Sequence, residues 1–316
     1  MNGAGLNRHR FLMIGPSAGW HAEELRAAAR RMNCRLQIVP YEALAASVAT
    51  GKLRLNASGS GLPGCEDGIR LQDHDAILTR TMPMASLDRL TFRLAILHAL
   101  SDRIGDQPIP VVNPPRALEL AIDKFATLAR LAAAGYPIPE TRFVQSRSAA
   151  MAAFDDLGGD CVVKPVLGGE GRGVMRIRDP QLAWTCFSTL DKLESVLQVQ
   201  RFIPPGGRDT RLLVIGHRVF AVRRENDEGF RSNVSAGAVC RAASVSETMA
   251  ESGRRIAAML GLVYASVDLI DNDNGPPLFL EVNAIPGWKG AQSVIEPSLA
   301  ECIVETLQRQ TSLIQA

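Results

Sequence analysis

The sequence predicts an α/β protein that folds into more than one domain. Short apolar strands and helix-patterned segments alternate along the first hundred residues, which is typical of a small parallel α/β unit. The double proline Pro114-Pro115 then interrupts regular structure and marks a domain boundary. A length of 316 residues gives room for two or three small domains, each with a core of its own.

The composition is that of an ordinary globular protein. Apolar residues make up 46% of the chain and charged residues 22%. The formal net charge of +2 is not that of a nucleic-acid-binding protein. No apolar run is long enough to span a membrane, and the N-terminus has no long apolar segment of the signal-peptide type. Six cysteines are scattered without a Cys-x-x-Cys pair, as expected of reduced thiols. These features predict a cytoplasmic protein that binds neither nucleic acid nor membrane.

The first domain is predicted to contain the alternating elements. In order they are strand 10–16, helix 21–32, strand 35–39, helix 41–48, a loop or short hairpin over 51–70, strand 75–80, helix 86–100 and strand 109–113. Trp20 and His21 lie where the first strand ends, the edge at which open α/β sheets bind ligands. A substrate contact is one interpretation of this pair, and ordinary packing is the more common role for such residues.

A lysine and a glycine-rich loop stand out beyond the prolines. The apolar strand 161–166 contains Lys164, and a lysine in such a strand has to find an anion or extend its ammonium group to water. Four glycines in the loop 167–173 then lead to strand 174–177. Backbone N–H groups of such a loop can surround phosphates. It is neither a Walker loop, because no Gly-Lys-Ser/Thr follows, nor a Rossmann loop, because no helix follows.

The remaining elements are predicted from periodicity and turn signals. They are helices 116–134, 147–157, 180–192 and 247–260, strand 195–203, a hairpin around Gly216-His217 and a C-terminal helix ending near residue 310.

Residues 264–283 predict a β-hairpin that gathers oxygen donors. Apolar runs carrying Asp268 and Glu281 flank a turn-rich segment. With Asn274-Gly275 as the turn, the register places Asp268 opposite Glu281, and Asn283 shares a face with Glu281 because they lie two residues apart. Such oxygens suit Mg²⁺ that also touches phosphate. A hairpin with solvated acids is the alternative, although a carboxylate within an apolar strand needs a partner or a metal.

Short motifs along residues 75–305 resemble those of ATP-grasp ligases, most closely the RimK-type α-L-glutamate ligases. Each motif is weakly specific by itself, but their order and spacing together are highly specific. The motifs are Asn113-Pro114-Pro115, Asp123-Lys124-Phe125, Val163-Lys164-Pro165, Gly168 to Gly173, Gln200-Arg201-Phe202, Asp209-Thr210-Arg211, Phe230-Arg231-Ser232-Asn233, Asp268, Glu281-Val282-Asn283 and Pro286-Gly287.

The resemblance implies a Rossmann-like N-terminal domain followed by a two-lobed ATP-grasp fold. The N-terminal domain would span residues 1–112. The central lobe, with the glycine-rich lid, would span 113–198, and the C-terminal lobe, with the Mg²⁺ site, 199–316.

The resemblance also implies the roles of the site residues. Two lysines would hold the ATP phosphates under the glycine loop, a hinge would read adenine through its backbone, and Asp209 would sit near the ribose. Arg211, Arg231 and Asn233 would steady the γ-phosphate and the acyl-phosphate. The metal, Mg²⁺ with Mn²⁺ as an alternative, would be held by Asp268, Glu281 and Asn283. The implied nucleotide-binding residues are Lys124, Lys164, Gly168, Gly169, Gly171, Gly173, Gln200, Arg201, Phe202, Asp209, Arg231, Ser232 and Asn233.

Two departures from the family pattern bear on specificity. The hinge position that usually carries an acid is Arg201 here, which affects nucleotide preference if the side chain takes part. The closing loop carries Trp288-Lys289, which is untypical of the ribosomal-protein branch. It looks more like the branch linked to tetrahydromethanopterin and methanofuran biosynthesis, and so implies a small-molecule acceptor.

The implied reaction is ATP-dependent amide formation. ATP would phosphorylate a carboxylate, and an amine, that of L-glutamate, would attack the acyl-phosphate. The protein would supply positioning and charge neutralisation rather than a nucleophile. The alternatives are glutamate addition to a protein C-terminus, a non-ligase ATP-grasp phosphotransferase and a catalytically silent nucleotide-binding module. The expected assembly is a homo-oligomer, a dimer or a tetramer.

Overall fold

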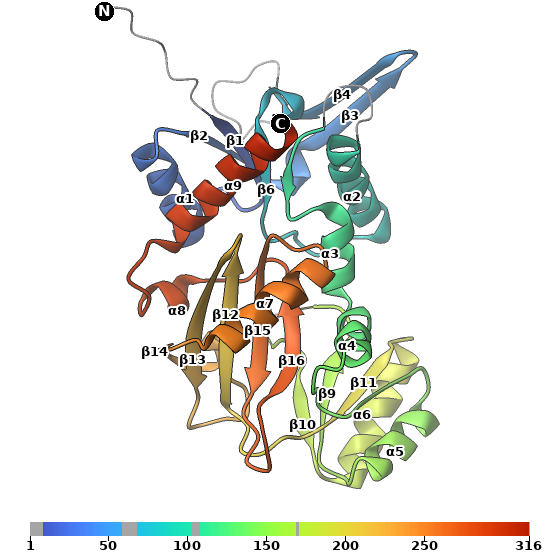
Figure 1. Cartoon of the computed structure of the whole chain (residues 1–316). Helices are drawn as coiled ribbons and strands as arrows, with labels where there is room; N and C mark the ends of the chain where they lie inside the picture. The colour runs from blue at the N-terminus through green and yellow to red at the C-terminus, as the bar shows by residue number, and fades with distance from the viewer. Residues whose placement is uncertain (1–8, 59–67, 103–107, 169–170, 316) are drawn as a thin grey trace, which may run out of the picture.

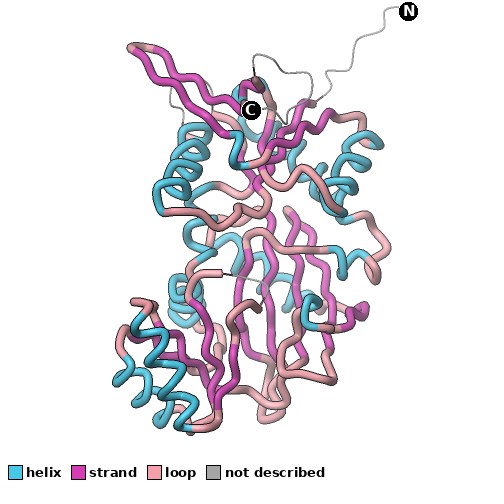
Figure 2. The backbone as a smooth tube through the Cα atoms, turned by 180° about the vertical axis from the view of Figure 1, so that it is seen from behind, coloured by secondary structure: helices cyan, strands magenta, loops and turns pink. Residues whose placement is uncertain are grey.

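The computed structural model describes residues 9–58, 68–102, 108–168 and 171–315. These residues form four sheets. Figure 1 shows the N-terminal part at the top, with the central and C-terminal lobes side by side below it, and Figure 2 shows the same arrangement from behind. Among the described residues, none of the helices is both long enough and apolar enough to cross a membrane.

The N-terminal sheet is parallel, as the alternation of strands and helices predicted. Its order is β2-β1-β6-β7, with β1 (Arg10–Ile14), β2 (Arg35–Val39), β6 (Ala76–Thr79) and β7 (Val111–Val112). Helix α2 (Leu87–Ser101) packs on one face, and α1 (Trp20–Arg31) and α9 (Leu299–Gln315) pack together on the other. The C-terminal helix therefore returns to the first sheet (Figure 1).

The helix predicted over residues 41–48 is wrong. The chain forms a 3₁₀ turn, η1 (Tyr41–Ala43), and strand β3 (Leu44–Ala49). This strand pairs with β4 (Lys52–Ala57), which pairs with β5 (Ile69–Arg70) ahead of the turn η2 (Leu71–Asp73). Alanine favours a helix locally, but Gly51 has a φ of +68° and closes a two-residue turn that holds the hairpin. Residues 59–67 of the predicted loop lie outside the described residues.

Asn113 joins the first sheet to the C-terminal lobe. Its side-chain N–H groups donate to the carbonyls of Tyr264 and Ala284, both at 2.6 Å. Its side-chain oxygen accepts the backbone N–H groups of Val263 at 2.8 Å and Tyr264 at 2.9 Å. This amide is buried and uses both its donors and both its acceptor positions. The motif Asn113-Pro114-Pro115 is therefore an anchor between two sheets.

The single helix predicted over residues 116–134 is two helices, α3 (Pro115–Ile122) and α4 (Lys124–Ala133). The break is at Asp123, which has an extended backbone. Its carboxylate accepts the N–H groups of Phe125 at 2.8 Å and Ala126 at 3.1 Å, and so caps the second helix. As a result Lys124 stands in the first turn of α4, beside the glycine-rich loop.

The central lobe is an antiparallel sheet covered by two helices. Its order is β10-β9-β11-β8, with β8 (Thr141–Val144), β9 (Cys161–Pro165), β10 (Met175–Ile177) and β11 (Leu197–Arg201). The predicted helices are confirmed as α5 (Arg147–Asp156) and α6 (Pro180–Lys192). The boundary expected at residue 198 falls within β11, and the domain limits stay a prediction.

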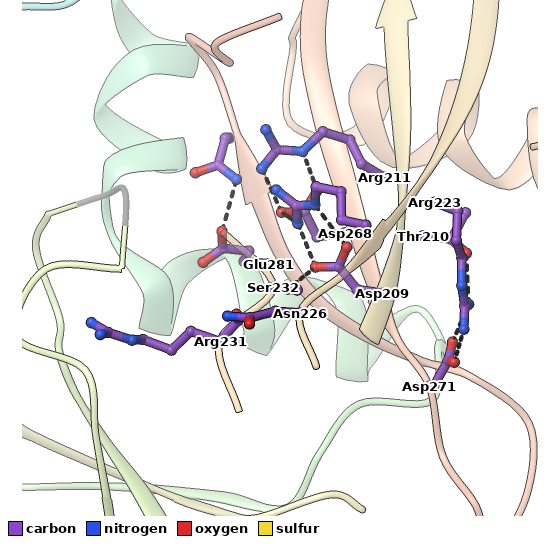
Figure 3. A network of polar contacts seen from close by, with 12 residues as sticks. Asp209, Thr210, Arg211, Arg223, Asn226, Arg231, Ser232, Asp268, Asp271 and Glu281 are labelled. Atoms are coloured by element: carbon purple, nitrogen blue, oxygen red, sulfur yellow. Dashed lines mark hydrogen bonds and ion pairs between the residues drawn. The ribbon is translucent and has the colours of Figure 1, made fainter. Parts of the chain in front are cut away.

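The C-terminal lobe is a five-stranded antiparallel sheet of order β14-β13-β12-β15-β16. Its elements are β12 (Arg208–Ile215), β13 (Arg218–Glu225), η3 (Val234–Ala236), β14 (Val239–Ala243), α7 (Glu247–Met259), β15 (Tyr264–Ile270), β16 (Leu278–Asn283) and α8 (Lys289–Gln292). Helix α7 packs on one face through Ile256 and Ala257. Polar side chains of β12, β13, β15 and β16 gather on the opposite face (Figure 3).

The register of the β15–β16 hairpin is the predicted one at its polar pair, where Asp268 lies opposite Glu281. Toward the turn the register shifts by one residue, so that Leu269 faces Phe279 and Leu280 is the extra residue of a β-bulge. The bulge increases the local twist beside Glu281, at the edge of the cleft between the two lobes.

Candidate active site

A cationic cleft lies between the central and C-terminal lobes. Among the described residues, six cationic side chains and three carboxylates line it: Lys124, Lys164, Arg172, Arg201, Arg224, Arg231, Asp209, Asp268 and Glu281. An excess of positive charge in a narrow cleft attracts and holds anionic ligands. The cleft therefore suits a polyphosphate together with acidic reactants.

The three predicted metal ligands come together on one side of this cleft. Asp268 and Glu281 are cross-strand neighbours, and the side-chain amide of Asn283 donates to Glu281 Oε1 at 3.0 Å. No group of three His, Cys, Asp or Glu side chains able to hold a metal is found within the described part of the chain; here the third donor is an amide. Two carboxylates and an amide oxygen are hard ligands, and they fit Mg²⁺.

Asp268 is held in place by two arginines. Arg211 donates Nε to Oδ1 at 2.8 Å and Nη2 to Oδ2 at 2.7 Å (Figure 3). Arg224 donates Nη2 to Oδ2 at 2.9 Å. Burial alone would raise the pKa of Asp268, but the two guanidinium groups outweigh it and hold the pKa below its usual range. A carboxylate can accept about four hydrogen bonds. One position on Oδ1 therefore stays open to a cation.

Arg224 lines the cleft, and the sequence analysis did not single it out. It is buried on β13 and bonds Asp209 through Nε at 2.7 Å and through Nη2. The adjacent Arg223 points the other way, to Asp271 at 2.5 Å. Strand alternation could have separated these two arginines, but only the fold shows which face is buried. Arg224 thereby links Asp209 to Asp268.

Asp209 is enclosed by protein partners. It is 1% exposed, and it accepts hydrogen bonds from Arg224 and from the Ser232 hydroxyl. Because Arg224 and Ser232 donate all three of these bonds, the arrangement favours a role for Asp209 in orienting the two side chains. A contact between Asp209 and the ribose stays a prediction.

Both predicted phosphate lysines line the cleft. Lys164 stands on β9, and burial lowers its pKa to about 8, against the opposing charge of Glu281. Lys124 donates Nζ to the carbonyl of Gly168 at 2.8 Å, and burial lowers its pKa as well. Two desolvated ammonium groups that face one cleft gain most from an anion between them.

The glycine-rich loop rests on the C-terminal lobe. Arg231 Nη1 donates to the carbonyl of Gly171 at 3.4 Å. A Cβ atom at Gly171, whose φ is +72°, would lie 2.6 Å from Asn233 Oδ1. The cleft beneath has an open volume of about 80 Å³, far below the roughly 300 Å³ of small ligand sites. We therefore expect this loop to lift when a nucleotide enters.

The other loop glycines differ in their surroundings. Gly173 has a φ of +70°, and a Cβ atom there would lie 2.9 Å from Pro165. Gly168 has a φ of +122°, and a Cβ atom there would meet open space. Gly169 was also predicted to contact the nucleotide, and it lies outside the described residues.

The hinge segment lines the cleft at the end of β11. Gln200 Nε2 donates to Thr141 Oγ1 at 2.9 Å, and the Phe202 N–H donates to the Asp160 carbonyl at 3.0 Å. The Arg201 guanidinium pairs with Glu140 at 2.8 Å. Glu140 therefore balances the charge that replaces the acid usual at this position. Backbone recognition of adenine stays a prediction.

Trp288 fixes the closing loop to the N-terminal domain. Its ring is fully buried and packs edge-on against Trp20 and His21, at centroid distances of 4.7 and 5.0 Å. Its backbone N–H donates to His21 Nε2 at 3.2 Å. Burial, with Arg80 and Lys289 nearby, lowers the pKa of His21 to about 4, so this ring is neutral at pH 7. Trp20, His21 and Trp288 thus form a packing cluster, while Lys289 remains exposed.

The chain is similar to known proteins in sequence and in fold. Residues 121–307 match the RimK-like ATP-grasp domain. The chain is 31% identical over 269 residues to the tetrahydromethanopterin:alpha-L-glutamate ligase of Methanosarcina acetivorans, which covers 76% of this chain and 82% of the relative. It is 32% identical over 245 residues to a probable alpha-L-glutamate ligase of Sodalis glossinidius, with coverages of 76% and 80%.

A solved structure shows the same fold. The ATP-grasp ligase PsnB, complexed with minimal precursor, Mg and ADP, aligns with a TM-score of 0.70 and 20% identity over 96% of this chain and 98% of that chain. The predicted fold class, an N-terminal α/β domain followed by two ATP-grasp lobes, is confirmed. The chain belongs to the RimK-like ATP-grasp family.

Proposed function

We propose that the protein is an ATP-dependent carboxylate–amine ligase that adds L-glutamate to a small-molecule or cofactor-precursor acceptor. The observation that carries the proposal is the cationic cleft in which Lys124 and Lys164 face the Asp268–Glu281 pair. This arrangement joins phosphate-binding cations to hard oxygen ligands, which is what phosphoryl transfer to a carboxylate requires. Glutamate is proposed from the names of the two curated relatives.

The reaction would proceed in two steps. The carboxylate of one substrate attacks the γ-phosphorus of ATP, and ADP leaves. The amine of the second substrate then attacks the carbonyl carbon of the acyl-phosphate. Inorganic phosphate leaves with the bonding electron pair, the amine loses a proton to solvent, and an amide remains. No protein side chain forms a covalent bond in either step. The protein therefore positions the reactants and neutralises their charge.

The side chains divide this task. Lys124 and Lys164 hold the phosphates as point charges. Arg231 and Asn233, which already contact the lid at Gly171, lie where they can steady the transferred group once the lid closes. Arg211 keeps Asp268 ionised and oriented. Asp268, Glu281 and Asn283 would hold Mg²⁺, or Mn²⁺ in its place, and the bound ion would supply charge neutralisation between phosphate oxygens.

A coupled assay tests the proposal. Purified enzyme is incubated with ATP, Mg²⁺ and panels of carboxylic acids and amines, ADP release is measured, and products are identified by mass spectrometry. The expected result is ADP release that requires both an acid and L-glutamate and yields one amide per ADP. ATP turnover that needs no amine would point to a phosphotransferase instead. Glutamate added only to a peptide C-terminus would move the acceptor class to proteins.

We also propose a homo-oligomer, dimeric or tetrameric, in the cytoplasm. The five described cysteines are free thiols, which supports a reducing compartment. Light scattering after gel filtration tests the assembly, and a monomeric mass at micromolar concentration would contradict it.

A further inference from the structure

A second cleft lies in the N-terminal domain, away from the nucleotide site. It has a volume of about 640 Å³ and is formed by the first residues of β1 and β2, the second half of α1, β5 and the residues after η2. These are the amino-terminal ends of parallel strands, whereas the nucleotide cleft and the Trp288 cluster lie beyond their carboxyl ends. The volume is that of a small-ligand site.

Like charges converge on this cleft from three elements. Arg10 comes from β1, Arg26 and Arg30 from α1, and Arg35 from β2. None of these four guanidinium groups forms an ion pair with a described residue. The neighbouring Arg31, which does not line the cleft, pairs with Glu301 at 2.5 Å. Arginines that form no ion pair with the described part of the chain therefore collect at the cleft.

The described part of the lining offers little negative charge to these four arginines. Asp73 is the one carboxylate among the described lining residues. His74 is buried and bonded to Gln37 at 2.7 Å, and burial lowers its pKa, with a further lowering from Arg10. The four arginines therefore surround a lining that is partly apolar, at Phe11, Leu36 and Ile69, and that includes a neutral His74.

Two ordinary explanations account for only part of this arrangement. A cation in the last turn of α1 is favoured by the helix dipole, which explains Arg30. A charged side chain on the edge strand β2 discourages strand pairing, which explains Arg35. Neither explains why Arg26 and Arg10 reach the same cleft. Clustered like charges repel one another unless an anion compensates them.

We propose that this cleft binds a small polyanion with three or more negative charges on phosphate or carboxylate groups, as a ligand separate from the nucleotide. Arginine suits this ligand because its planar fork binds phosphate and carboxylate with two parallel hydrogen bonds. A ligand here would join α1, β1, β2 and β5 and so stabilise the folded chain by mass action.

Calorimetric titration with inorganic tripolyphosphate, without Mg²⁺, tests the site in three variants of the full chain. The double variant Arg26→Ser/Arg35→Ser removes cleft charges. The variant Lys124→Ala/Lys164→Ala removes the nucleotide-site cations, and Arg89→Ser/Arg116→Ser removes the same charge from exposed positions elsewhere. We expect the cleft variant to bind about tenfold or more weakly, and the other two to keep this binding event.

The opposite pattern would overturn the proposal. If the lysine variant loses all tripolyphosphate binding and Arg26→Ser/Arg35→Ser keeps it, the probe binds only at the nucleotide site. Equal weakening in the cleft variant and the Arg89→Ser/Arg116→Ser control would show a general charge effect.

Chemical modification of the unaltered chain gives a readout that does not depend on variants folding. Tripolyphosphate should protect Arg26, Arg30 and Arg35 from phenylglyoxal, as read by mass spectrometry, and leave Arg89 and Arg116 reactive. Uniform reactivity would refute the site. Repeating the experiment with tetraglutamate distinguishes the ligand classes: stronger protection by the peptide indicates a polycarboxylate, and stronger protection by tripolyphosphate indicates a polyphosphate.

Discussion

At the scale of single residues, the burial of Lys164 leads to a testable pH dependence. Burial lowers its pKa to about 8 from an ordinary 10.5, so the free protein loses the Lys164 charge as pH rises through about 8. ATP binds the charged form, and its affinity should therefore fall between pH 7 and 9. Lys164→Ala should weaken ATP binding by about tenfold to a hundredfold and remove this pH dependence.

Calorimetric titration of ATP at several pH values measures both effects. The exposed Lys192→Ala serves as the control, with unchanged affinity and an unchanged pH profile. Wild-type affinity that stays flat from pH 7 to 9, or a Lys164→Ala variant that binds ATP normally, would return Lys164 to a structural role.

Glu281 tests the metal assignment. Glu281→Gln keeps the shape of the side chain and its bond with Asn283 but removes the charge that a divalent ion needs. Mg²⁺-dependent ADP release should fall by about a hundredfold or more, while the melting temperature stays within a few degrees. Asp273→Asn, an exposed acid in the same hairpin, should leave activity unchanged. Near-normal activity of Glu281→Gln would show that the metal lies elsewhere.

Local sequence patterns predicted the Asp268–Glu281 pair but did not predict the position of Arg224 in the cleft. The Asp268–Glu281 register depends on one turn and on strand periodicity, both of which are visible in a single stretch of sequence. The partners of Arg224 come from β12 and β15, and nothing nearby in the chain shows that its face is enclosed. The pairing of strands that are distant in sequence determines which side chains are buried. A single sequence therefore does not show which arginine faces the cleft.

At the scale of elements, the same limit explains the two helices that were misplaced. Residues 44–49 look helical by composition, but pairing with β4 outweighs that preference. The break at Asp123 was visible as a capping residue, yet the periodicity continued through it. The helices α5, α6 and α7 have clear capping residues and local periodicity, and the sequence predicted them correctly.

The glycine-rich loop is the element expected to move. In the structure Gly171 rests on Asn233, and the cleft below is too small for a nucleotide. Gly171→Val places a branched side chain against Asn233 at a positive φ, so the loop should no longer close over the acyl-phosphate. We expect ADP release without product, or loss of turnover. The ratio of ADP to amide measures this coupling.

Gly135→Val is the matched control, because Gly135 also has a positive φ, of +80°, but its Cβ would meet open space outside the cleft. Hydrogen exchange across residues 167–173 should slow when a non-hydrolysable ATP analogue and Mg²⁺ are added. Equal exchange in both states, together with a fully coupled Gly171→Val enzyme, would show that the loop is a fixed turn.

At the scale of the whole molecule, the C-terminal lobe is held against the N-terminal domain (Figure 1). Three of the contacts between them contribute to this attachment. Helix α9 packs beside α1, the Trp288 ring packs on Trp20 and His21, and the Asn113 amide is bonded into the ends of β15 and β16. Asn113 forms four buried hydrogen bonds through one side chain, so its substitution tests this attachment directly.

Asn113→Ala should leave two carbonyls and two N–H groups without their partner. An unsatisfied buried polar group costs about 1–3 kcal/mol, and relaxation of the cavity recovers part of the sum, so we expect a loss of roughly 3–5 kcal/mol in the free energy of unfolding. Urea unfolding measures it. Asn274→Ala, at an exposed turn position, should change stability by less than about 0.5 kcal/mol.

Comparing two spectroscopic probes shows whether the two parts separate before they unfold. Trp20 and Trp288 lie at the contact between the N-terminal domain and the C-terminal lobe, and the third tryptophan, Trp184, lies on α6. In a Trp184→Phe background, tryptophan fluorescence therefore follows this contact, while far-ultraviolet circular dichroism follows the helices and strands. If Asn113 anchors the two bodies, the fluorescence transition of Asn113→Ala should move to lower urea than the dichroism transition. Coincident transitions in the variant, with a stability close to that of wild type, would mean that α9 and Trp288 suffice to hold the bodies together.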